Sequence, residues 1–228
     1  MDPPEDLASF TVDGVKLTGV SFYDILSWEV DDEMPDELAW SQRDALRAAV
    51  GKKLIKHWIT LEAPVKVSVS GEAERSFTLK INTYFGAESD ATPHKRAIKT
   101  SDVFVYNGHS YIGYGPLDPS RFSSADFPAS YQILFVDGCV SYNYYEKDYF
   151  PLKEGGSRNL ELITNGLEAP SWKSGYALGR FLNTMLDGKQ ASYSDLLAAA
   201  SATDQLRVVD GELDNEYSPE ATPIKVSW

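Results

Sequence analysis

The sequence contains little cysteine, little histidine and no long apolar segment. Cys139 is the only cysteine among 228 residues, so no intrachain disulfide stabilises the fold. No apolar run approaches the ~20 residues that cross a bilayer, which excludes a transmembrane helix. Basic residues number 21 against 34 acidic ones, a net charge of −13, which argues against a nucleic-acid partner. The first six residues are polar and acidic, so we expect no secretory signal, and the localisation stays open.

The acidic residues are concentrated at the two ends of the chain. Residues 1–39 contain eleven acids and one base, residues 204–228 contain six acids and two bases, and the middle is nearly neutral. We therefore expect an acidic N-terminal extension over residues 1–60 and a main domain over residues 61–228. The net charge says little about the chemistry of the central part. The high aromatic and aliphatic content excludes a disordered chain.

Periodic patterns predict a mixed α/β domain. Two continuous apolar runs, over residues 103–106 and 133–136, and a third, weaker run over 160–163 are typical of strands that are buried on both faces. The remaining predicted elements are short strands within 7–28, a helix over 38–59, strands over 65–71 and 76–85 with a turn at Gly71, helices over 92–99, 175–186 and 193–202, and a last strand over 224–226. Strands alternate with helices over residues 76–186, which indicates a largely parallel sheet with helices on its faces.

Two of the apolar runs end in residues that can carry chemistry. His109 follows the first run after Gly108, and Cys139 follows the second run after Gly138. The interval of 30 residues between them is about what a crossover between parallel neighbouring strands requires. If the strands are parallel neighbours, both side chains emerge at the carboxyl edge of the sheet, where open α/β sheets place their sites.

A thiol beside an imidazole predicts nucleophilic acyl transfer. A free thiol ionises near pH 8.5, so a nearby base is needed to supply the thiolate at neutral pH. His109 would then protonate the leaving amine, and glycine-rich turns leave backbone N–H groups free to bind an oxyanion. The alternative interpretation is an inert cysteine after a strand and a histidine in a turn; the matching positions of the two residues favour a dyad.

These blocks resemble those of the caspase-like cysteine peptidases, a group that includes caspases, legumain, separase, gingipains and clostripain. Tyr106–Ser110 (Tyr-Asn-Gly-His-Ser) resembles their histidine block, and Phe135–Cys139 (Phe-Val-Asp-Gly-Cys) resembles the Asp-x-Cys block of the clostripain-like branch. Residues 217–226 resemble the segment that enters the last strand of that fold. The resemblance covers residues 65–228 and implies a three-layer sandwich, with a mostly parallel sheet and helices on both faces.

The resemblance also implies roles for individual residues. Cys139 would be the nucleophile and His109 the general acid and base of an endopeptidase that acts on a polypeptide. Backbone N–H groups at Ser110 and Gly138 would hold the oxyanion, although the family usually has glycine where Ser110 stands. Asp137 would favour Arg or Lys before the scissile bond; its alternative role is that of an ordinary Asp-Gly turn. The segment 146–159 offers Lys147, Lys153 and Arg158 as sites of self-cleavage.

Other residues indicate no further site. His57 and His94 lie in basic stretches and are interpreted as surface residues, and three scattered histidines with one cysteine give no metal-ligand spacing. No phosphate-binding loop is present, so we expect no cofactor. The aromatic segment 142–150 is interpreted as the wall of a peptide cleft, a sugar-binding surface or a partly buried loop. Accordingly, the alternative function is a catalytically inactive caspase-like module that binds protein or sugar.

Overall fold

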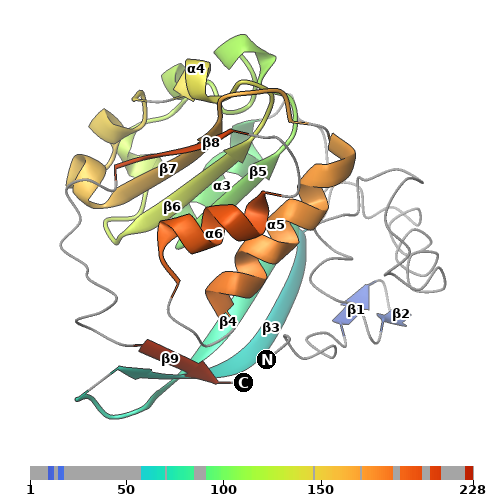
Figure 1. Ribbon diagram of the computed structural model, residues 1–228, viewed down its shortest axis with the longest axis vertical. Coiled ribbons are helices and arrows are strands. Elements are labelled where there is room, and N and C mark those ends of the chain that lie inside the picture. Colours follow the sequence, from blue (N-terminus) through green and yellow to red (C-terminus); the bar gives the residue numbers. More distant parts are fainter. Residues whose placement is uncertain are drawn as a thin grey trace. The chain divides into compact units, whose positions relative to one another are not determined.

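The computed structural model describes residues 10–12, 15–17, 58–69, 71–84, 91–145, 147–169, 171–186, 191–201, 206–211 and 224–227. The chain divides into two compact units. One consists of residues 1–86, 175–200 and 217–228, and the other consists of residues 87–174 and 201–216. Helices and strands are mixed along the chain (Figure 1), in keeping with the predicted α/β class. Among the described helices, none is both long enough and apolar enough to cross a membrane.

The first unit contains antiparallel sheets. Strands β1 (Phe10–Val12) and β2 (Val15–Leu17) pair with each other. Strands β3 (Trp58–Val69), β4 (Arg75–Tyr84) and β9 (Ile224–Ser227) form a sheet of order β4-β3-β9. The β3–β4 connection includes Gly71 at φ 85°, as the predicted turn requires. Most of α5 (Ser171–Leu186) and all of α6 (Tyr193–Ala200) also belong to this unit.

Strand β3 begins earlier than the sequence analysis predicts. The predicted helix over 38–59 lies outside the described residues up to residue 57, but its last two residues, Trp58 and Ile59, are the first two of β3, so its predicted end is wrong. Apolar residues alternate with polar ones or proline from Ile59 to Val69, and this period of two continues the strand backward. The predicted domain boundary at residue 60 therefore falls inside β3.

The second unit is built around a four-stranded sheet of order β5-β6-β7-β8. Its strands are β5 (Val103–Asn107), β6 (Gln132–Asp137), β7 (Leu160–Asn165) and β8 (Arg207–Asp210). The first three are parallel, and β8 runs antiparallel to β7. Every residue of β6 and β7 is buried, which confirms that these apolar runs are central strands.

Helix α3 (Ala91–Thr100) confirms the predicted helix in this region and lies against the sheet. The side-chain amide of Gln132, at the start of β6, donates hydrogen bonds to the carbonyl oxygens of Ile98 and Ser101 at 2.6 and 2.7 Å. The short helix α4 (Tyr142–Tyr145) follows β6. Short 3₁₀ turns, η1 (Tyr111–Gly113), η2 (Pro119–Arg121), η3 (Ser124–Asp126), η4 (Phe150–Leu152) and η5 (Gly156–Arg158), complete the unit.

The parallel part of the sheet is narrower than predicted. Strand β4 pairs antiparallel with β3, and β9 also joins β3 rather than the sheet of β5–β8. The last predicted strand therefore forms, but in the other sheet. The edge strand β8 was missed, because Arg-Val-Val-Asp is only four residues long and shows neither alternation nor a continuous apolar run.

Candidate functional site

The carboxyl edge of the β5–β8 sheet brings the predicted residues into neighbouring loops. Strands β5 and β6 are parallel neighbours, with Asn107 paired to Asp137. His109 and Cys139 each follow two residues after this pair, so the two side chains occupy equivalent positions on adjacent strand ends. The predicted pairing of these two strands is confirmed.

The two loops contact each other directly. The N–H of Gly108 donates to the carbonyl oxygen of Asp137 at 3.4 Å, and Ser110 Oγ donates a short hydrogen bond to the carbonyl oxygen of Cys139. A Cβ atom at Gly138 would lie 2.7 Å from Ser110 Oγ and 3.0 Å from the carbonyl oxygen of Gly108. A larger residue would displace Ser110 Oγ and crowd the Gly108 carbonyl, so Gly138 allows the histidine loop and the cysteine loop to approach closely.

Tyrosine hydroxyls hold the histidine loop from the core side. Tyr106 donates to the carbonyl oxygen of His109 at 2.9 Å, and Tyr145 donates to that of Ser110 at 2.8 Å. Burial raises the pKa of Tyr145 to about 12, so its hydroxyl remains a donor over the physiological range. The His109 side chain itself is exposed, and its ring lies edge-on to that of Tyr111, with the centroids 5.7 Å apart.

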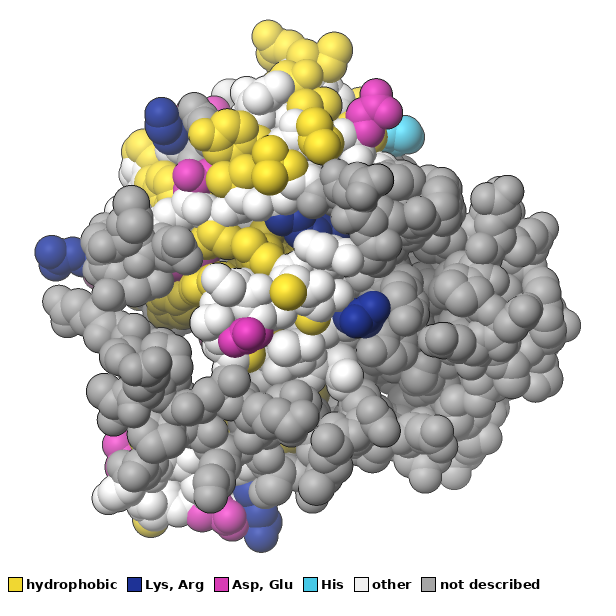
Figure 2. Space-filling model, in the orientation of Figure 1, with side chains coloured by type: hydrophobic (Ala, Val, Ile, Leu, Met, Phe, Trp, Pro, Cys, Tyr) yellow, Lys and Arg dark blue, Asp and Glu magenta, His cyan; other side chains and the backbone are white. Residues whose placement is uncertain are grey.

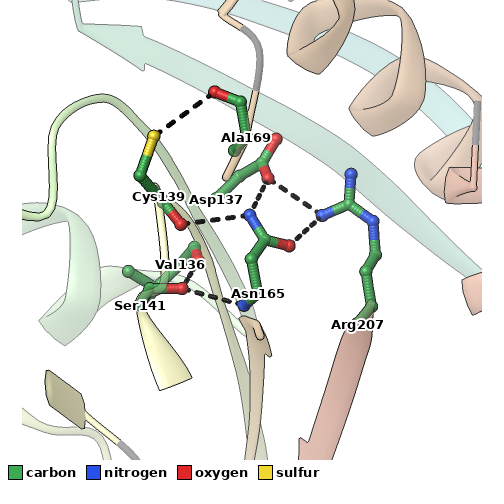
Figure 3. Close-up of polar contacts among 8 residues, drawn as sticks. Val136, Asp137, Cys139, Ser141, Asn165, Ala169 and Arg207 are labelled. Atoms are coloured by element: carbon green, nitrogen blue, oxygen red, sulfur yellow. Dashed lines mark hydrogen bonds and ion pairs between the residues drawn. The ribbon is translucent and has the colours of Figure 1, made fainter. Parts of the chain in front are cut away.

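The Cys139 thiol is half-buried and points toward the next loop (Figure 3). Its sulfur lies 3.6 Å from the carbonyl oxygen of Ala169. Within the described part of the chain, no hydrogen bond joins the sulfur to the His109 imidazole. Hydrogen bonds between catalytic groups are often long before substrate binds. The proximity of Cys139 and His109 is therefore judged from the shared sheet edge and from the contacts between their loops.

The backbone after the thiol is strained. Val140 has φ 49°, a left-handed conformation that is unfavourable for a β-branched residue. Its N–H donates to the carbonyl oxygen of Leu167 at 3.0 Å, and the N–H of Ser141 donates to that of Gly138 at 3.3 Å. Ser141 Oγ in turn donates to the carbonyl oxygen of Val136 at 2.8 Å. These bonds fix a sharp turn that starts at Cys139.

Backbone donors remain at both loops. Among the described residues, none accepts a hydrogen bond from the N–H of Ser110 or from that of Gly138. Ser110 has φ −73° and ψ −20°, a conformation that every residue adopts without strain. A serine in the place of the expected glycine therefore costs the backbone nothing here.

Asp137 is enclosed by two polar residues that the sequence analysis missed (Figure 3). Arg207 Nη1 lies 2.9 Å from Asp137 Oδ1, and Asn165 Nδ2 lies 2.6 Å from the same oxygen. Nη1 of Arg207 also donates to Asn165 Oδ1 at 2.8 Å, and Asn165 Nδ2 lies 3.2 Å from the carbonyl oxygen of Gly138. The side chains of Arg207 and Asp137 are 1% and 0% exposed. The carboxylate therefore already binds a guanidinium, supplied by β8 of the same chain.

One of these two residues had a usable signal in the sequence. Asn165 comes shortly after the third apolar run, as Asn107 and Asp137 come after the first two, and this pattern could have indicated that all three polar residues lie at one edge. Arg207 carries no such signal, because the four residues of its strand show no pattern that predicts a strand.

The three predicted self-cleavage residues differ in exposure. Lys147 and Arg158 are exposed, whereas Lys153 is buried, and its ammonium donates to the carbonyl oxygens of Pro128 and Ser130, both at 2.5 Å. Burial lowers the pKa of Lys153. The peptide bond after Lys153 is therefore accessible to a protease only after local opening, whereas the side chains of Lys147 and Arg158 are already exposed.

The aromatic segment after Cys139 belongs largely to the core. Tyr145 and Tyr149 are each 1% exposed, and their rings stack with centroids 6.1 Å apart. Phe122 and Phe127 also pack against Tyr149. Of the three interpretations of this segment, the buried structural loop fits the structure for these two tyrosines.

No set of three His, Cys, Asp or Glu side chains converges as a metal site among the described residues. His94 is half-buried, and its ring lies 5.6 Å from that of Tyr106. His57 lies outside the described residues.

Protein-family models, curated protein sequences and solved structures were each compared with the chain, and none of them matches it.

Proposed function

We propose that this chain is a cysteine endopeptidase with a caspase-like fold, in which Cys139 is the nucleophile and His109 the general acid and base. The observation that carries the proposal is the register of β5 and β6, which sets both residues two positions beyond a directly paired Asn107 and Asp137. The close contact of Gly138 with the histidine loop supports it, because a Cβ atom at this position would crowd Ser110 Oγ and the carbonyl oxygen of Gly108.

In the proposed reaction, His109 takes the proton of the thiol, and the sulfur attacks the carbonyl carbon of the peptide bond. The N–H groups of Ser110 and Gly138 stabilise the resulting oxyanion. The C–N bond then breaks as the imidazolium returns its proton to the leaving amine. Water hydrolyses the thioester with His109 as the base, which releases the acid and restores the thiol.

Asp137 is not proposed to select Arg or Lys before the scissile bond. The buried carboxylate is paired with Arg207, and a substrate guanidinium would have to displace that side chain and leave a buried charge without its partner. Leaving a buried charge unpaired costs about 3–5 kcal/mol, more than a single new ion pair recovers.

Peptide hydrolysis by the purified chain and its variants tests the proposal. We expect Cys139→Ala and His109→Ala each to lower the rate of hydrolysis of a mixed peptide library by about 10²-fold or more. His57→Ala, which removes a histidine without a proposed role, serves as the matched control. Equal rates for the wild type and Cys139→Ala would exclude a thiol peptidase.

A second candidate function is a binding module without catalysis. The observation that favours it is the hydrogen bond from the thiol to the carbonyl oxygen of Ala169, which occupies the thiol proton away from His109. This function predicts that Cys139→Ala leaves the binding of a protein or sugar partner intact and that no peptide is cleaved by either form.

A further inference from the structure

Exposed apolar side chains gather at the edge of the sheet that carries the candidate site. Seven large hydrophobic side chains are exposed in the described part of the chain, and five of them lie at this edge. Tyr111, Ile112 and Tyr114 follow β5, Leu167 follows β7, and Leu206 precedes the antiparallel β8. Hydrophobic side chains are prominent in the upper part of the view in Figure 2.

The turn after His109 presents its apolar side chains in a fixed arrangement. Tyr111, Ile112 and Gly113 have φ values of 51°, 53° and 81°, so three consecutive residues are left-handed. The N–H of Gly113 donates to the carbonyl oxygen of Ser110 at 2.9 Å, and that of Tyr114 donates to Tyr111 at 3.0 Å. The ring of Tyr111 lies so close to Gly115 that a Cβ atom there would collide with it.

Folding stability does not account for this turn. Ile112 is 69% exposed and Tyr114 is 78% exposed, so neither side chain contributes much to the core. A β-branched residue at a positive φ is moreover unfavourable for the backbone. Strain that is held by the surrounding structure clusters at functional sites, and exposed apolar surface is a common feature of binding sites.

The position of this turn connects it to the proposed reaction. The Tyr111 ring lies against that of His109, and Ser110 ties the loop to the carbonyl of Cys139. On the other side of Cys139, the exposed Leu167 accepts a hydrogen bond from the N–H of Val140. Glu168 is an exposed acid in that same loop, whereas the Asp137 carboxylate is enclosed with Arg207.

We infer that the site takes polypeptides with a large apolar or aromatic side chain next to the scissile bond, held by Tyr111, Ile112 and Tyr114. This inference rests on the proposed peptidase function and names its substrate class. The rigid tyrosine rings supply contact area at a low entropic cost, and burying one such substrate side chain is worth about tenfold or more in affinity.

Alkylation of Cys139 by peptidyl chloromethyl ketones tests the substrate class. The reagents carry Phe, Leu, Lys or Ala beside the reactive carbon, and mass spectrometry measures the second-order rate of labelling. We expect Phe and Leu reagents to react about tenfold or more faster than the Lys and Ala reagents. The variants Ile112→Ala and Tyr114→Ala should each bring the Phe-to-Ala ratio toward one, while Phe77→Ala, an exposed phenylalanine of β4, should leave it unchanged.

The outcomes separate this inference from the proposed function. If the Lys reagent reacts fastest and loses this advantage in Glu168→Gln, the apolar preference is wrong. Equal labelling rates for all four reagents would also overturn it. In both cases the proposed function is retained if iodoacetamide labels the wild type faster than His109→Ala. Iodoacetamide labelling that is independent of His109, together with no labelling by any ketone, rejects both.

Discussion

The buried pair of Arg207 and Asp137 allows a quantitative prediction. The two side chains are 1% and 0% exposed, with 2.9 Å between Nη1 and Oδ1. The Arg207→Met variant removes the cation and leaves the carboxylate with the Asn165 amide. It also removes the guanidinium that lies over the Phe135 ring, 4.8 Å from its centroid.

The expected cost follows from burial. At an effective dielectric constant of 20, charges at this separation attract each other by about 6 kcal/mol, and the desolvation of both groups offsets much of that gain. Removing one partner of a buried pair costs about 3–5 kcal/mol, out of the 5–15 kcal/mol typical of a whole domain. Arg207→Met and Asp137→Asn should therefore each lower the free energy of unfolding by about 3–5 kcal/mol.

The double variant separates the ion pair from other effects. Asp137→Asn with Arg207→Met removes both charges, so the expected loss is smaller than the sum of the two single losses by about 2 kcal/mol or more. Urea unfolding followed by circular dichroism provides the free energies, and an unchanged slope with urea shows that the denatured state is comparable. Single losses below about 1 kcal/mol, typical of exposed pairs, or losses that simply add, would refute the reasoning.

Two further predictions concern the loop that carries His109. Ile112→Gly should raise the free energy of unfolding by about 0.5–1 kcal/mol, because it relieves a strained φ at a side chain that is 69% exposed; a loss in thermal unfolding would contradict the strain. Tyr145→Phe should lower it by about 1 kcal/mol near pH 7, since the hydrogen bond to the carbonyl oxygen of Ser110 is lost. Burial raises the pKa of Tyr145 from 10.0 to about 12, so its contribution is complete below pH 10 and is lost as the pH rises through 12. Urea titrations between pH 9 and pH 12 should show a loss of about 2 kcal/mol in the wild type that Tyr145→Phe lacks, and parallel losses in both proteins would reject this linkage.

Strands with a strong local signal could be predicted from the sequence. The runs around Phe104, Leu134 and Leu162 are largely apolar. Every residue of β6 and β7 is buried, and alternate residues of β5 are buried. Such runs are recognised without any knowledge of the tertiary structure. The interval of 30 residues was compatible with parallel pairing of β5 and β6, and the observed pairing sets His109 and Cys139 at equivalent positions after these strands.

Features that depend on distant contacts could not be predicted. Strand β8 has only four residues and exists because β7 offers it an antiparallel edge. Arg207 reaches Asp137 across 70 positions of sequence, and no local pattern indicates such a pair. The same reason explains β9, whose apolar residues suit a strand but do not specify that its partner is β3.

The rate at which iodoacetamide alkylates Cys139 at pH 6.5 tests the central claim most directly, because it reports whether His109 acts on the thiol without requiring a substrate. A thiolate supplied by the imidazole reacts at a pH where an ordinary thiol is almost fully protonated. We predict that His109→Ala lowers the rate constant by about tenfold or more, while His57→Ala leaves it unchanged. Equal rate constants in the wild type and in His109→Ala would contradict the dyad.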